Sequence, residues 1–415
     1  MKILILGINY APEKVGIAVY SAGMAEALAE RGHDVQVIAA QPYYPAWKIM
    51  DGYNAFSYRR TQENGVDVTR VPHYIPASPS GAKRLLHHVS FGASALFPMV
   101  SRGLFWRPDI VVTVAPSLIA APLARLAAAF CGARSWLHIQ DFEVEAAFAT
   151  GLLKDGGRGA ALARWFEAKV LKGFDVVSTI SPQMCRKLAD KGIDEQRIVE
   201  FRNWADIDAI QPATGPSPYR AEWGITTPHV ALYSGNIANK QGIEIVVGAA
   251  RLLEHRKDVT FVVCGEGPNR ANLEKQAAGL TNIQFHDLQP KVRLNDLMGL
   301  ATIHLLPQLA GAADLVLPSK LTNMLASGRP VVATASPGTG LAHEVEGCGI
   351  VTPPGDVEAF AAGIATLADD EGAHEQFSRN ARDRALSRWS MREVLKGFEL
   401  ELATLGRVPT VQAGQ

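Results

Sequence analysis

The chain has 415 residues, of which 47% are hydrophobic and 20% charged, and its 41 basic residues balance its 41 acidic ones. A chain of this length is too long for one compact core, so we expect two globular domains. The zero net charge disfavours a nucleic-acid-binding protein, because that class usually carries a strong basic excess. Four cysteines stand singly, without the spacing of a zinc site, which fits a reducing cytoplasm and predicts no structural metal.

The N-terminal residues Met1 to Gly7 form a short apolar run that ends in glycine. This run is far too short for a signal peptide and is typical of a first buried strand. We therefore expect a cytoplasmic protein.

In the first half, short apolar runs rich in β-branched residues alternate with helical patterns. Runs that do not alternate between apolar and polar residues are typical of strands covered on both faces, as in a parallel α/β sheet. The expected strands are 2–6, 34–39, 67–71, 109–114, 135–139, 176–180 and 198–202.

The second half repeats this pattern, with expected strands at 229–233, 259–264, 282–286, 303–306, 330–334 and 349–351. Two Rossmann-like, doubly wound α/β domains that face each other across a cleft fit the pattern best. The expected parts are a first domain at 1–210, a linker at 211–223, a second domain at 224–389, a helix at about 390–405 that crosses back to the first domain, and a disordered tail at 406–415.

A glycine-containing turn, Ser234 to Gly242, follows the first strand of the second half and leads into a helical pattern. Free backbone N–H groups, a helix dipole and a lysine together offer a binding site for phosphate. We therefore predict an anion site that includes Gly235, Asn236 and Lys240. The alternative for Lys240 is a solvated turn lysine.

The loop from Tyr10 to Gly16 follows the first strand, so it lies at the carboxyl edge of the sheet, where ligands bind. Gly16 would let the backbone approach a ligand closely, or would simply supply a turn with positive φ. No Gly-x-Gly-x-x-Gly pattern follows the strand, which disfavours an NAD-dependent enzyme.

His138 and Asp141 come at the end of another expected strand, at the same edge of the sheet. A histidine there can donate or accept a hydrogen bond near a reacting centre. The alternatives are a histidine that only caps the strand and an aspartate that caps the helix after it.

These motifs resemble the family 4 glycosyltransferases of the GT-B fold, and among them the WcaI-type enzymes of colanic acid and related exopolysaccharide synthesis. The resemblance covers nearly the whole chain. It rests on the segments 9–16, 137–143, 233–242 and 317–323. It implies that His138 and Asp141 lie in the active site, that Gly16 approaches the donor, and that Lys240 contacts the donor diphosphate.

The resemblance extends to further donor contacts in the second half. Gly265 and Glu266 resemble a loop near the nucleotide base, and Ser319 is expected to cap a helix whose N–H groups point at an anion. Lys320 is expected to assist Lys240, which stands one residue earlier than the family's lysine. Asn323 replaces a glutamate of the family pattern; its amide can still bind a ribose hydroxyl, but without the charge-assisted hydrogen bond.

The predicted function is a retaining, metal-independent glycosyltransferase that needs no cofactor beyond its nucleotide-sugar substrate. The resemblance implies a lipid-linked saccharide acceptor and suggests a GDP-fucose-type donor, although the sequence does not separate GDP from UDP. Asp206 and Asp208 form an Asp-x-Asp pair, which we interpret as coincidental at a linker. Two alternatives stay open: a catalytically weak scaffold of a polysaccharide assembly complex, and a nucleotide-sugar epimerase.

Residues 81–106 combine basic residues and histidines with an apolar run. This mixture suits peripheral contact with the inner face of the cytoplasmic membrane, and equally suits a pair of core helices. The run is too short and too interrupted for a spanning helix.

Overall fold

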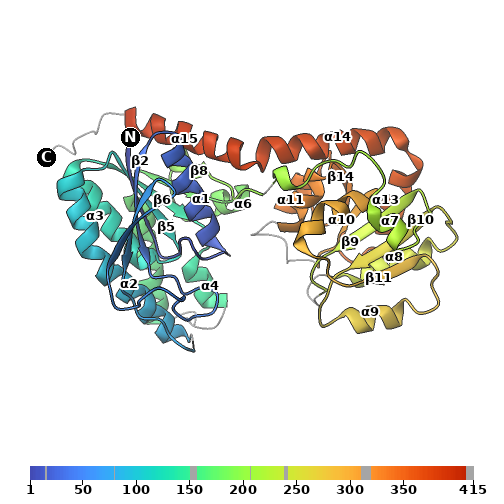
Figure 1. Ribbon diagram of the computed structural model, residues 1–415, viewed down its shortest axis with the longest axis horizontal. Helices are drawn as coiled ribbons and strands as arrows, with labels where there is room; N and C mark the ends of the chain where they lie inside the picture. Colours follow the sequence, from blue (N-terminus) through green and yellow to red (C-terminus); the bar gives the residue numbers. More distant parts are fainter. Residues whose placement is uncertain are drawn as a thin grey trace. The chain divides into compact units, whose positions relative to one another are not determined.

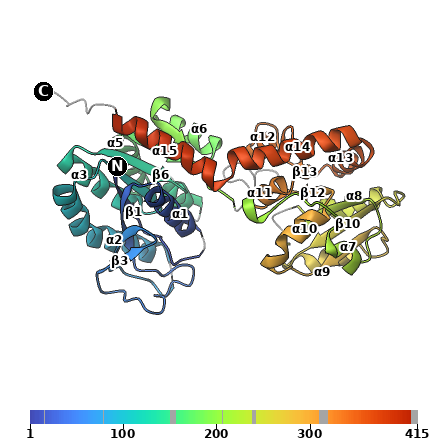
Figure 2. The same cartoon turned by 45° about the horizontal axis from the view of Figure 1, so that its top comes forward.

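A computed structural model describes residues 1–14, 16–78, 80–149, 157–205, 207–237, 242–309 and 319–407. The chain forms two compact units, which divide between Asn203 and Trp204 and again between Val394 and Leu395. Unit 1 is the N-terminal part together with the chain from Leu395 onward, and unit 2 is the part between them. Each unit is a sheet with helices packed on it (Figures 1 and 2). The predicted class of two doubly wound α/β domains is confirmed.

The sheet of unit 1 has the strand order β3-β4-β2-β1-β5-β6-β7-β8, and every pairing except β3 with β4 is parallel. All six residues of β5 are buried, as expected for a strand covered on both faces. The strands are β1 (Lys2–Gly7), β2 (Asp34–Ala40), β3 (Arg59–Glu63), β4 (Val66–Val71), β5 (Ile110–Ala115), β6 (Arg134–Ile139), β7 (Val176–Thr179) and β8 (Ile198–Glu200).

One strand of unit 1, β3, was not predicted from the sequence. Its residues are polar and lie at the edge of the sheet, so no apolar run marks them. The helices are α1 (Ile17–Glu30), α2 (Gly81–Ser101), the π-helix η1 (Arg102–Trp106), η2 (Leu118–Ala120), α3 (Ala121–Cys131), α4 (Glu143–Ala149), α5 (Arg158–Gly173), α6 (Pro182–Asp190) and η3 (Glu195–Arg197).

Unit 2 has a fully parallel sheet of order β11-β10-β9-β12-β13-β14, with an apolar cluster on each face. Its strands are β9 (His229–Ser234), β10 (Val259–Cys264), β11 (Ile283–His286), β12 (Ile303–Leu306), β13 (Val331–Thr334) and β14 (Gly349–Thr352). Its helices are η4 (Ile207–Ala209), α7 (Pro218–Glu222), α8 (Glu244–Leu252), α9 (Arg270–Gln276), η6 (Lys291–Arg293), α10 (Leu294–Leu300), α11 (Ser319–Ala326), α12 (Gly340–Val345), α13 (Val357–Asp369) and α14 (Glu371–Arg388).

The segment 211–223, expected to be a linker, is folded onto unit 2. The Gln211 backbone N–H donates to Asn295 Oδ1 at 2.8 Å, and the Ser217 hydroxyl donates to the Asp296 carbonyl at 2.7 Å. Tyr219 in α7 is fully buried. Its prolines and glycine interrupt the pattern of apolar runs, which is why it was expected to be a linker. The hydrogen-bond acceptors that hold it lie on α10, some 80 residues further along the chain.

The last helix, α15 (Met391–Arg407), belongs to unit 1 from Leu395 onward. Its Phe398 ring stacks on Phe201, with centroids 4.2 Å apart, and meets the edge of Trp136 at 5.0 Å. Glu399 pairs with Arg31 at 3.0 Å and with His33 at 2.9 Å. The helix therefore completes the packing of unit 1. Most of the expected tail, residues 408–415, lies outside the described residues.

We predict that Phe398→Ala lowers the stability of unit 1 by about 3 to 5 kcal/mol, because it removes a buried aromatic ring. Leu400→Ala on the same helix is the matched control, since Leu400 is 61% exposed. Its expected effect is within about 0.5 kcal/mol. Denaturant titration, with hydrogen exchange to follow the strands of unit 1, measures both. Equal midpoints for the two variants would show that α15 does not stabilise this unit.

Candidate functional site

The strand order reverses once in each sheet. In unit 1 the chain moves outward in both directions from β1, which lies between β2 and β5, and in unit 2 from β9, which lies between β10 and β12. Ligands of open parallel sheets bind at the carboxyl ends of the strands beside such a switch point. Each unit therefore has one position at which the expected site residues should gather.

In unit 2, the turns after β9 and β10 are in backbone contact. The Gly235 N–H donates to the Cys264 carbonyl at 2.9 Å, and the Ile237 N–H donates to the Glu266 carbonyl at 2.8 Å. A Cβ atom on Gly265 would overlap the carbonyl oxygen of Gly235, so no other residue fits there without a backbone shift. The two glycines hold the turn after β9 in one position against the turn after β10.

Lys320, at the start of α11, extends over Gly235. Its Nζ donates to the Tyr233 hydroxyl at 2.8 Å and lies 4.5 Å from the centroid of that ring. A Cβ atom on Gly235 would lie 2.7 Å from Nζ, so the absence of a side chain at Gly235 makes room for the lysine. Burial lowers the pKa of Lys320 to about 8. A partly desolvated ammonium group thus sits at the carboxyl end of β9.

The other expected donor residues lie around this lysine or outside the described chain. Asn323 is half-buried on α11, three residues after Lys320 and therefore on the same side of the helix. Asn236 is exposed, and its carbonyl accepts from the Tyr233 hydroxyl at 2.6 Å. Lys240 lies outside the described residues, as does the side chain of Ser319.

Arg270 on α9 fixes the turn that carries Gly265 and Glu266. Its Nη1 donates to the Gly265 carbonyl at 3.1 Å and to Glu266 Oε1 at 2.9 Å, and also pairs with Asp287 at 2.7 Å. No role of Arg270 was predicted from the sequence. Its position four residues after the turn residue Glu266, at the start of a helical pattern, is the feature of the sequence that could have indicated this ion pair.

In unit 1, the loop after β1 is tied to the loop after β2 by Glu13, which is only 3% exposed. Its Oε1 accepts the backbone N–H groups of Tyr43 and Tyr44, each at 2.8 Å, and its Oε2 accepts from Asn9 Nδ2 at 2.9 Å. Gly16 precedes α1 with a φ of 64°, so its backbone needs glycine. Glu13 is a positioning residue that the motif contained but that the sequence analysis did not single out.

His138 is buried in unit 1, with 2% of its surface exposed. Its Nδ1 lies 2.9 Å from the Ser178 hydroxyl, and its Nε2 lies 2.9 Å from Nε2 of Gln140, whose amide is paired with that of Asn203. Since the Gln140 nitrogen can only donate, His138 Nε2 accepts and Nδ1 carries the proton.

Burial lowers the pKa of His138 to about 3, so the ring is neutral at physiological pH. Ser178 also accepts from Trp136 Nε1 at 2.7 Å, which makes the histidine part of a buried polar network. These contacts show that His138 helps to hold the end of β6 in place. Contact of His138 with the donor sugar stays a prediction.

Asp141 is exposed just beyond β6, and the half-buried carboxylate nearby is Glu143. Glu143 Oε1 accepts the backbone N–H groups of Ser117 at 2.6 Å and Leu118 at 2.7 Å, so it joins α4 to the loop after β5. Burial raises the pKa of Glu143 to about 7. Glu145 pairs instead with Lys187 and Lys191. Glu143 is a second positioning residue that the sequence analysis missed.

Within the described ranges, no group of three or more His, Cys, Asp or Glu side chains could hold a metal ion. Asp208 lies on the exposed turn η4, and Asp206 lies outside those ranges. What the described residues do offer is a half-buried lysine ammonium group at the carboxyl end of β9, a group that can bind an anion and stabilise a phosphate leaving group.

Known proteins share these two units. Residues 15–204 match the model of the glycosyl transferase 4-like domain, and residues 217–384 match that of glycosyl transferases group 1. Among solved structures, the sucrose-phosphate synthase of Thermosynechococcus elongatus aligns with a TM-score of 0.67 at 16% identity, over 97% of this chain and 98% of the other. The HepE protein of Anabaena, in complex with UDP and glucose, aligns with a TM-score of 0.62 at 16% identity, over 97% of this chain and 100% of the other.

One relative found by sequence is much more similar to this chain than these two solved structures are. The putative colanic acid biosynthesis glycosyl transferase WcaI of Escherichia coli K12 is 43% identical over 374 residues, which span 88% of this chain and 91% of that protein. The alpha-D-kanosaminyltransferase of Streptomyces kanamyceticus is 29% identical over 181 residues, 41% of this chain and 45% of the other. The expected resemblance is therefore confirmed, and the chain belongs to the family 4 glycosyltransferases of the GT-B fold.

Proposed function

We propose that this glycosyltransferase transfers a sugar from a nucleotide-sugar donor, bound by unit 2, to a saccharide acceptor in the synthesis of an exopolysaccharide of the colanic acid type. The position of Lys320 over Gly235, at the switch point of unit 2, carries the proposal. The name of the WcaI relative supports the pathway, and the complex of HepE with UDP and glucose supports a nucleotide-bound sugar.

In the proposed reaction, the acceptor hydroxyl oxygen bonds to the anomeric carbon as the bond from that carbon to the diphosphate breaks. The hydroxyl proton passes to the departing diphosphate, whose charge Lys320 and nearby backbone N–H groups stabilise. Attack from the side on which the diphosphate leaves would retain the anomeric configuration without an enzymic nucleophile. Lys240 is proposed as the second cation, so no metal ion or further cofactor takes part.

The finer assignments are also proposals. A GDP-fucose-type donor, or the corresponding UDP-sugar, is expected for unit 2, and a lipid-linked saccharide is expected as the acceptor on the side of unit 1. An acceptor of this kind is reached at the inner face of the cytoplasmic membrane, where residues 81–106 would make peripheral contact.

The test of this function is a panel of GDP-, UDP- and ADP-sugars incubated with the purified enzyme and a membrane lipid extract. The expected result is release of one nucleoside diphosphate together with a sugar-extended lipid, both seen by mass spectrometry. A rearranged sugar formed without acceptor would instead show an epimerase. No turnover and no nucleotide binding would favour the scaffold.

We predict that Lys320→Ala weakens binding of the nucleoside diphosphate by about ten- to a hundredfold, because a charge-assisted hydrogen bond is lost. Lys240→Ala should weaken it as well. Lys275→Ala, an exposed lysine on α9 of the same unit, is the control and should leave the affinity unchanged. Isothermal titration measures all three. Wild-type affinity in the Lys320 variant would remove this residue from the donor site.

Affinity for the nucleoside diphosphate should also depend on pH. The anion binds the charged form of Lys320, whose pKa is lowered to about 8 by burial, so binding above that pH requires proton uptake. Phosphate ionisation is complete above about pH 7.5. Affinity should therefore fall between pH 8 and 9.5, by up to about tenfold per unit. The Lys320→Arg variant keeps its charge and should flatten the profile. A flat wild-type profile would contradict the role of the ammonium group.

A further inference from the structure

Helix α2 of unit 1 is apolar on the face that it presents to solvent. Its inner face, which includes Phe91 and Met99, is buried in the core of unit 1. Its outward positions recur every three or four residues and are also apolar, with Phe97 77% exposed. These outward large side chains are Leu85, Leu86, Val89, Leu96 and Phe97. A surface helix normally turns polar residues outward, so this face is built to meet something other than water.

The π-helix η1 extends this surface. Gly103 lies against α3, where a Cβ atom would come within 2.6 Å of the Ala127 carbonyl oxygen. The close approach holds η1 in place and directs Leu104 and Phe105 outward, with Phe105 84% exposed. Neither side chain is needed for the core of unit 1.

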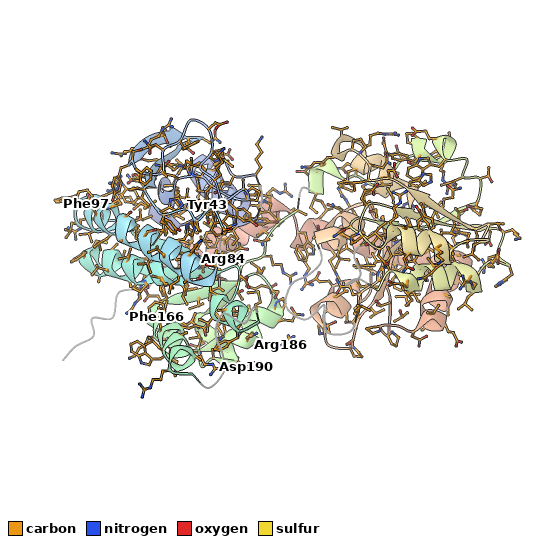
Figure 3. All side chains as sticks on the ribbon, turned by 90° about the horizontal axis from the view of Figure 1, so that it is seen from below. Tyr43, Arg84, Phe97, Phe166, Arg186 and Asp190 are labelled. Carbon is orange, nitrogen blue, oxygen red and sulfur yellow. The ribbon has the colours of Figure 1, made fainter. Side chains whose placement is uncertain are left out.

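Two neighbouring helices continue the surface with residues far from 81–106 in the sequence. α3 packs beside α2 and contacts η1 and α5. Leu126 and Phe130 are exposed on α3, and Leu162 and Trp165 are exposed on α5. We call the exposed apolar side chains of α2, η1, α3 and α5 the apolar face. Figure 3 shows Arg84 and Phe97 near opposite ends of α2, and Phe166 on α5.

The charges of these segments are mostly positive. Residues 81–134 contain six Lys or Arg side chains and a single carboxylate, Asp109, although the whole chain is neutral. Residues 158–173 add four cations and one carboxylate, Glu167, which is buried and paired with Lys191. The same segments carry exposed cations: Lys83, Arg84, Arg107, Arg125, Arg158 and Lys169. Exposed apolar side chains together with an excess of cations match the chemistry of an anionic lipid surface, where aromatic residues enter the acyl boundary and cations meet the phosphates.

We propose that the apolar face docks unit 1 on a bilayer that contains anionic lipid, with Phe97, Phe105 and Trp165 entering the interface. Among the described residues, no helix is long and apolar enough to cross a membrane. The assignment rests on the proposed lipid-linked acceptor for its purpose, and it adds α3, α5 and a requirement for lipid charge to the contact proposed for residues 81–106. Membrane binding itself requires neither donor nor acceptor.

The test is sedimentation of the full chain with vesicles of phosphatidylcholine alone or with about one third phosphatidylglycerol. The expected result is binding to the anionic vesicles, weakened by salt, and little binding to the neutral ones. The double variant Phe97→Gln/Phe105→Gln should lower the partition by about tenfold or more. Phe56→Gln is the matched control, because Phe56 is 91% exposed in unit 1 and lies outside the apolar face. It should bind like the wild type.

Nucleotide binding by the double variant, measured in parallel, should equal that of the wild type, which separates this test from that of the proposed function. The denaturant midpoint of its unit 1, followed by hydrogen exchange in the strands of that unit, should also equal that of the wild type, which shows that unit 1 is folded. Equal sedimentation of the double variant and the wild type would overturn the proposal, as would equal binding to neutral and anionic vesicles. A dimer that the double variant dissociates, seen by analytical ultracentrifugation without vesicle binding, would assign the face to a second copy of the chain instead.

Discussion

The backbone contact between the turns after β9 and β10 is the constraint on which the candidate donor site depends. Gly265 has no room for a side chain beside the Gly235 carbonyl, so the sheet itself fixes the turn after β9. Gly235 in turn leaves space for Lys320, whose ammonium group is held on the Tyr233 hydroxyl. A charge held on rigid elements before the substrate arrives needs little reorganisation during the reaction, which suits the stabilisation of a leaving diphosphate.

The fold could be predicted from the sequence because parallel strands covered on both faces are continuous apolar runs, as β1 and β5 show. β3 could not, because it is a polar strand at the edge of the sheet, paired with β4. The segment 211–223 was predicted as a linker for a related reason, because its prolines are a local signal. The contacts with Asn295 and Asp296 that fold it onto unit 2 come from residues far away in the sequence.

The candidate site was predictable in its glycine turn and its second lysine, since short motifs mark both. Its supporting contacts were not. His138 meets Ser178, 40 residues away, and Gln140 meets Asn203, 63 residues away, so the burial of this histidine depends on tertiary packing. Glu13 and Glu143 likewise act on backbone N–H groups of other loops. In unit 1 the buried and half-buried polar groups shape the loops at the sheet edge, and in unit 2 a half-buried lysine lies at the carboxyl end of β9.

The measurement that tests this account most directly is a crystal structure of the enzyme with GDP or UDP. We expect the diphosphate at the carboxyl end of β9, within hydrogen-bond distance of Lys320 Nζ and of backbone N–H groups in the turn that begins at Gly235. A diphosphate bound elsewhere in unit 2, or at the Glu13 loop of unit 1, and out of reach of Lys320 would contradict the place of this lysine in the donor site.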